Sequence, residues 1–219
     1  MQLKLITDFK DIKRDSDDEY IYLGLVDFSI YKVAELNKKI LISSKDFAIN
    51  DLDKTQRIKK LEYCETLHKK LISSLSEKLN ELHKEDYNSK IWELIFGRWL
   101  KDFIYISYNN FNVIQNLLKN KKLNSIKISN SQPSDIHTKN YEHLVESYLS
   151  TNWNKNLNSL IIQYLKPNVK IETENLKKDL NIKSKNFKKQ NIFKKTKNFI
   201  FSVINFFLKK KENIFFKFF

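Results

Sequence analysis

Apolar residues recur at every third or fourth position from Ile58 to Leu82, and Lys and Glu fill most positions between them. This spacing predicts one long amphipathic helix over residues 54–83. Asp53 stands where the N-cap of that helix belongs, since its carboxylate can accept hydrogen bonds from the free amides of the first turn. This prediction fixes the secondary structure of residues 54–83 as a single helix.

A second helix is predicted over residues 89–119. Its apolar and aromatic side chains occupy more than one helical face, so we expect it to be largely buried. Gly97 lies inside it and costs about 1 kcal/mol relative to Ala. Such a glycine indicates either close packing against another backbone or a break between two helices.

The remaining segments predict short strands and shorter helices. Strands are expected near the start of the chain, over 20–24 and 39–43, and over 124–129. Shorter helices are expected over 140–150 and 153–165, and residues 26–37 could form another. Strands separated by helices predict an α/β class, a helix-rich Rossmann-like lobe over residues 1–166 followed by a basic, Lys- and Phe-rich linker over 167–219.

Composition excludes several classes of protein. The 219 residues include only two Gly, two Pro and one Cys. No GxGxxG, GxxxxGK or GxSxG motif occurs, so Gly-rich phosphate loops and a nucleophile elbow have no support. The single Cys64 excludes an internal disulfide framework and a Cys-based zinc cluster, which fits a cytoplasmic protein.

The positive charge is concentrated near the end of the chain. The formal net charge is +14, and residues 167–219 alone carry 14 basic and 4 acidic residues. This distribution favours a linker, an arm or a peripheral membrane contact, and makes nucleic acid an unlikely partner for the rest. The final aromatic residues, from Phe215 to Phe219, are typical of a strand buried in a larger protein, so we expect the chain to continue.

Few residues carry recognisable chemistry. His68 is expected to be solvated, because Lys69 and Lys70 follow it. His83 closes the first long helix, where the helix dipole favours a cation, and Asn80 lies one turn earlier on the same side. Asp51 and Asp53 could hold a metal on a diphosphate, although capping is the favoured role, and no histidine has metal-ligand spacing.

Aromatic residues of the second long helix allow two interpretations. Trp92, Trp99, Phe103, Tyr105 and Tyr108 could form a stacking platform for a base or a sugar, but helical spacing favours the core. Arg98 and Asp102, four residues apart, could form a local ion pair.

The segment LNELHKEDYNSKIWELIFGRWLKDFIYISY resembles a family of transferases encoded with bacterial surface-polysaccharide genes. The matching positions are Leu79, Asn80, His83, Trp92, Gly97, Trp99, Leu100 and Tyr108. Looser similarity covers about the first three quarters of the chain. The resemblance implies a two-lobed, GT-B-like glycosyltransferase, of which this chain forms the acceptor-side lobe.

The resemblance also implies substrates and roles. The partners would be a sugar or glycan acceptor and a nucleotide-sugar donor, with no further cofactor; the residue spacing predicts no metal site. His83 is the predicted catalytic base, since a histidine near its unperturbed pKa of about 6.5 suits the deprotonation of a hydroxyl. Asn80, Trp92, Trp99, Tyr108 and Asp53 are the predicted substrate-binding residues. The alternative is a non-catalytic binding module whose basic tail contacts RNA or anionic membrane.

Overall fold

The computed structural model describes residues 2–12, 17–24, 40–42 and 54–174. Its strands form one sheet of order β3-β2-β1-β4-β5, in which every pair is parallel. They are β1 (Leu3–Ile6), β2 (Glu19–Tyr22), β3 (Ile40–Ile42), β4 (Ser125–Ser129) and β5 (Lys170–Glu174). The helices are α3 (Lys54–His83), α4 (Ser89–Asn120), α5 (Tyr141–Tyr148) and α6 (Thr151–Leu165), with short 3-10 turns η1 (Phe9–Asp11) and η3 (Pro133–Ile136).

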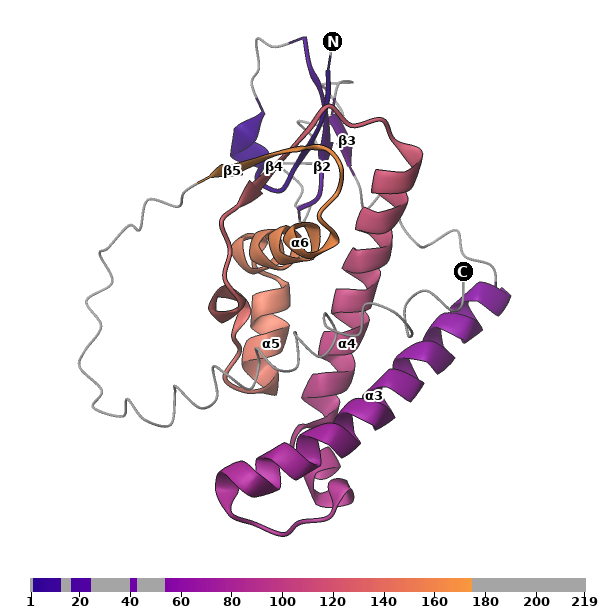
Figure 1. Cartoon of the computed structure of the whole chain (residues 1–219), viewed down its shortest axis with the longest axis vertical. Coiled ribbons are helices and arrows are strands. Elements are labelled where there is room, and N and C mark those ends of the chain that lie inside the picture. The colour runs from indigo at the N-terminus through magenta and orange to yellow at the C-terminus, as the bar shows by residue number, and fades with distance from the viewer. Residues whose placement is uncertain (1, 13–16, 25–39, 43–53, 175–219) are drawn as a thin grey trace, which may run out of the picture.

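The strand order reverses beside β1. The chain passes from β1 outward to β2 and β3, returns to β4 on the other side of β1, and ends the sheet with β5. Helices α4 and α6 cover one face of this sheet, where Leu5, Ile126 and Ile162 are fully buried together. Figure 1 shows the sheet at one end of the molecule and α6 running across below it.

Four of the five strands and the four helices are confirmed where the sequence predicts them. β5 was not predicted, although Val169, Ile171 and Thr173 alternate there with Lys170, Glu172 and Glu174. Pairing with β4, in register from Ser125 and Lys170 onward, places it in the sheet. The predicted cap Asp53, residues 26–37 and the basic segment beyond 174 lie outside the described residues.

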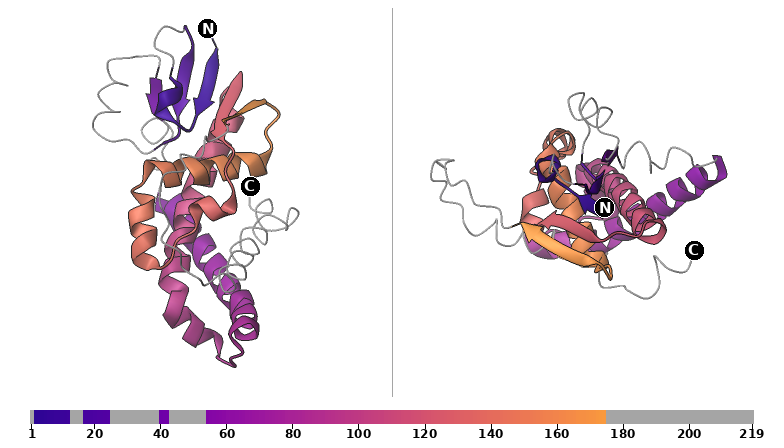
Figure 2. Two further views of the ribbon diagram at one scale, coloured as in Figure 1. Left: turned by 90° about the vertical axis from the view of Figure 1, so that its left-hand side faces the viewer. Right: turned by 90° about the horizontal axis from the view of Figure 1, so that it is seen from above.

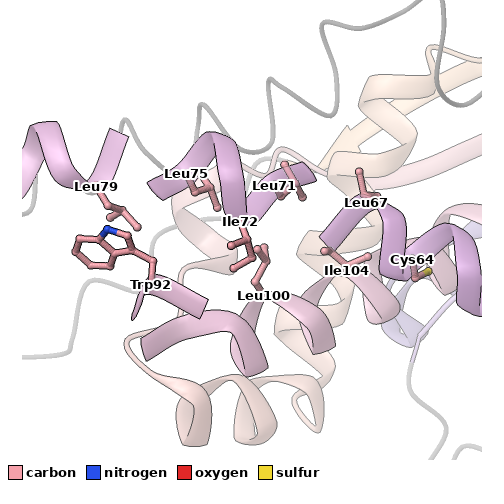
Figure 3. Packing of buried hydrophobic residues seen from close by; sticks show 9 residues of the cluster. All are labelled: Cys64, Leu67, Leu71, Ile72, Leu75, Leu79, Trp92, Leu100 and Ile104. Atoms are coloured by element: carbon pink, nitrogen blue, oxygen red, sulfur yellow. The ribbon is translucent and has the colours of Figure 1, made fainter. Parts of the chain in front are cut away.

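α3 and α4 form an antiparallel hairpin that projects away from the sheet (Figure 2). Its core consists of Cys64, Leu67, Leu71, Ile72, Leu75, Leu79, Trp92, Leu100 and Ile104 (Figure 3). Asn88 begins α4, since its side-chain oxygen accepts a hydrogen bond from the Ile91 amide at 3.2 Å. The apolar residues that recur every third or fourth position in α3 therefore pack against α4.

His68 is buried, and the expectation of a solvated histidine is wrong. Its side chain is only 5% exposed, and Nε2 lies 3.0 Å from the carbonyl oxygen of Gly97 across the hairpin. The two lysines that follow His68 point outward on the other side of α3. α4 continues unbroken through Gly97, so this glycine marks a close approach of the two helices rather than a break.

α4 is less buried than the sequence suggested. Ile91, Leu94 and Ile95 are 37%, 87% and 63% exposed, because α3 covers one face of α4 and Tyr141 of α5 contacts α4 at Arg98 and Asp102, beyond these residues. Ile58 and Leu61, the first members of the α3 stripe, are also exposed. Among the described residues, no helix is both long and apolar enough to cross a bilayer.

Candidate functional site

The α3–α4 turn brings together three of the predicted site residues. The side-chain oxygen of Asn80 accepts hydrogen bonds from Trp92 Nε1 at 2.7 Å and from the Tyr87 amide at 3.2 Å. The Asn80 amide nitrogen donates to the Tyr87 carbonyl at 2.8 Å. The ring of His83 lies 5.6 Å from that of Trp92. The oxygen and the nitrogen of the Asn80 side-chain amide are therefore both hydrogen-bonded to residues of the protein itself.

The backbone of this turn is also closed on itself. Lys84 has a φ of 59°, in the left-handed region, and the Glu85 amide donates to the Asn80 carbonyl at 3.1 Å. This is the backbone arrangement of a Schellman helix end. His83 is the exposed last residue of α3. At this end of a helix, the helix dipole favours a positive charge such as that of a protonated imidazole.

Trp99 and Tyr108 lie elsewhere on α4. Trp99 donates from Nε1 to the Thr138 hydroxyl at 2.8 Å and stacks on Phe103 with ring centres 5.4 Å apart. The Tyr108 ring lies 5.1 Å from that of Tyr63. At 1.5 Å per residue, Tyr108 is about 24 Å from Trp92 along the helix. The predicted aromatic residues therefore do not line one common wall.

Polar side chains gather instead at the carboxyl ends of the strands. Asp8 follows β1, and its carboxylate pairs with the Lys155 ammonium of α6 at 2.7 Å. The Lys155 side chain is 7% exposed and that of Asp8 is 22% exposed. In open parallel sheets, ligands bind beyond the carboxyl ends of the strands where the strand order reverses. Asp8 and Lys155 lie at this reversal, between β1 and β4.

α6 supplies most of the other groups at this edge. Asn156 accepts a hydrogen bond from the Ser131 hydroxyl at 2.9 Å, and Asn158 donates to the carbonyl of Leu23 at 2.6 Å. The Ser129 amide donates to the Ser159 hydroxyl at 3.1 Å. These contacts hold the first half of α6 against the ends of β2 and β4.

One polar group at this edge has no partner within the described structure. The Ser129 side chain is fully buried, and its hydroxyl makes no hydrogen bond to any described residue. Buried hydroxyls are nearly always hydrogen-bonded, so an unsatisfied one commonly marks a place for a ligand or a water molecule. We call the set formed by Asp8, Ser129, Ser131, Lys155 and Asn156 the sheet-edge cluster.

The charges of the sheet-edge cluster are balanced. Burial tends to raise the pKa of Asp8, but the hydrogen bonds from Lys155 and from the Lys10 amide outweigh burial and hold that pKa below its ordinary value. A second pair, Lys127 with Asp11, joins β4 to η1. Asp8 is therefore ionised at neutral pH and accepts hydrogen bonds. With each ammonium matched by a carboxylate, this cluster suits hydroxyl groups better than a diphosphate.

The sheet-edge cluster was not predicted from the sequence. A signal was present, because residues 154–159 read NKNLNS and place polar side chains on every face of a helix that must be partly buried. No described group of three or more His, Cys, Asp or Glu residues could hold a metal ion. The local Arg98–Asp102 pair is confirmed at 3.3 Å, and Tyr141 also donates to Asp102.

A parallel sheet that reverses its order beside β1, with polar groups beyond its carboxyl edge, defines a Rossmann-like α/β lobe. The sequence profile of the LIC12162 family transferases matches residues 6–218, and the chain belongs to that family. No curated protein and no solved structure matches the chain.

Proposed function

We propose that this transferase moves a glycosyl group and that the sheet-edge cluster binds the sugar acceptor. The membership in a transferase family and the resemblance to surface-polysaccharide enzymes support the reaction class. The observation that carries the location is the Asp8–Lys155 pair at the strand-order reversal. The donor is a nucleotide sugar, held mainly by the second lobe of a GT-B-like enzyme.

In this reaction an acceptor hydroxyl attacks the anomeric carbon of the donor. A carbon–oxygen bond forms to the acceptor while the bond from the anomeric carbon to the diphosphate oxygen breaks. The nucleoside diphosphate leaves with that electron pair, and the hydroxyl proton passes to a base. Asp8 is ionised and partly exposed, so its carboxylate accepts the hydrogen bond of the hydroxyl and then the proton. Lys155 fixes the orientation of this carboxylate.

His83 offers a different location for the base, and the two locations exclude each other. Trp92, beside His83, precedes Phe103 by 11 residues of one continuous helix, and Phe103 packs with Trp153, which lies two residues before Lys155 on α6. Along the helix that separation is about 17 Å. No sugar hydroxyl bound at the sheet edge could contact His83.

The test is a transfer assay on the full-length protein, with nucleoside diphosphate release measured for a panel of nucleotide sugars. We expect Asp8→Asn to reduce kcat by about 100-fold or more, because general-base catalysis contributes at least that much. Asp18→Asn is the matched control, since it breaks a Lys–Asp pair of 2.5 Å with Lys4, near the amino ends of the strands. His83→Ala should leave kcat unchanged.

Two outcomes would overturn this assignment. Equal kcat losses in Asp8→Asn and Asp18→Asn would indicate that the Asp8–Lys155 pair has only a structural role. A loss confined to His83→Ala would move the reacting hydroxyl to the α3–α4 turn. Release of nucleoside diphosphate from none of the nucleotide sugars would argue against glycosyl transfer itself.

A further inference from the structure

Lys60 on α3 is held differently from the other lysines that the structure ties to a partner. Six described lysines form ion pairs with carboxylates: Lys4, Lys78, Lys101, Lys127, Lys155 and Lys170. The Lys60 ammonium instead donates to the side-chain oxygen of Asn109 on α4. Within the described part of the chain, no carboxylate lies at ion-pair distance from it.

The surroundings of Lys60 supply no negative charge. Tyr63 and Tyr108 pack their rings together between the same two helices, and Cys64 lies one turn from Lys60 on α3. Cys64 is 1% exposed, and burial raises the pKa of its thiol to about 11, so the thiol is neutral at pH 7. Burial lowers the pKa of Lys60, which is half-buried. Lys60 is thus a partly desolvated cation among neutral groups.

A partly buried charge is costly unless another charge or several hydrogen bonds compensate it. Asn109 satisfies one of the three N–H groups of the ammonium, which leaves two for a ligand. An oxyanion would neutralise the charge of the Lys60 ammonium and accept hydrogen bonds from its two remaining N–H groups. The amide nitrogen of Asn109 is a further hydrogen-bond donor on the adjoining turn of α4.

We propose that Lys60, with Asn109 beside it, binds an oxyanion between α3 and α4, such as the phosphate or the carboxylate of a ligand. This site does not depend on the acceptor site proposed above.

The experiment is isothermal titration of the full-length protein with pyrophosphate and, separately, with glucuronate, which distinguishes a phosphate from a carboxylate ligand. We expect saturable binding of at least one probe, weakened about tenfold or more in Lys60→Met, since a charge-assisted hydrogen bond is lost. Lys59→Met is the matched control, because it removes the same charge from an exposed neighbouring position.

A second measurement does not depend on any variant. NMR of the protein labelled with 13C-lysine follows the titration of Lys60, and the bound probe should raise the pKa of this ammonium. Equal weakening in Lys59→Met and Lys60→Met, or no saturable binding of either probe, would overturn the proposal. A Lys60 titration that neither probe shifts would overturn it as well.

Discussion

Asn80 is the residue whose replacement best separates a structural from a substrate-binding role at the α3–α4 turn. Asn80→Ala removes three hydrogen bonds, to the Trp92 indole nitrogen and to the amide and carbonyl of Tyr87. The Tyr87 backbone lies in an exposed turn, so water replaces its two bonds at little net cost. Trp92 is 6% exposed, and its N–H would be left buried without a partner.

The unsatisfied indole therefore sets the magnitude of the effect. A buried donor left unpaired costs about 1–3 kcal/mol, so we expect Asn80→Ala to lower the free energy of unfolding by about 2 kcal/mol. For a chain of this size, that corresponds to a decrease in Tm of roughly 4–8 °C. Urea denaturation followed by tryptophan fluorescence and by circular dichroism measures the loss.

A double-mutant cycle identifies the bond responsible. Trp92→Phe removes the indole N–H but keeps an aromatic ring in the core, so Asn80→Ala should cost much less in that background. The interaction energy should be about 1 kcal/mol or more. A loss below about 0.5 kcal/mol for Asn80→Ala alone, together with weakened acceptor binding, would refute this reasoning and restore the predicted contact with substrate.

Three further predictions concern single sites. Gly97→Ala should stabilise the protein by about 0.5–1 kcal/mol in thermal unfolding, because helix propensity improves while the new methyl group meets the flexible, exposed Glu93 at 3.0 Å and His68 Nε2 at an ordinary contact distance of 3.6 Å; a decrease in Tm would contradict it. Lys84→Gly should raise stability by about 1 kcal/mol in urea unfolding, since glycine adopts the φ of 59° without strain; an unchanged urea midpoint would count against it. The pKa of Asp8 is lower in the folded than in the unfolded protein. The stability that its pair with Lys155 contributes is therefore present above the unfolded pKa of about 4 and is lost as the pH falls through the folded pKa. Urea midpoints measured from pH 6 to pH 3 should fall less in Asp8→Asn than in the natural protein.

The boundaries of the two long helices could be predicted because their signal is local. Residues 54–83 and 89–119 were predicted as helices, and the structure gives Lys54–His83 and Ser89–Asn120. Apolar spacing and capping residues act within one or two turns, so the sequence alone displays them. β5 also has a local signal, the alternation of Ile171 and Thr173 with Lys170, Glu172 and Glu174, which was missed because residues 167–219 were interpreted as a basic linker.

Burial along the helices could not be predicted as well. His68 and Leu94 show opposite errors, because the histidine is buried among lysines and the leucine is exposed in an apolar segment. The burial of each residue depends on how far the neighbouring helix extends, and the sequence of its own helix does not contain that information. Gly97 indicated a close approach, but only the structure identifies the His68 side chain as the group that approaches it.

By itself, the sequence determined where the helices and most of the strands form and which classes of phosphate-binding motif are absent. The family resemblance placed His83, Asn80 and Trp92 in one site together with Trp99 and Tyr108, and the short turn between α3 and α4 brings the first three together. Only the tertiary structure decided that Asp8 and Lys155, separated by 147 positions, share one edge of the sheet. The strand order β3-β2-β1-β4-β5 brings them together, and strand order depends on pairing between distant segments rather than on local propensity.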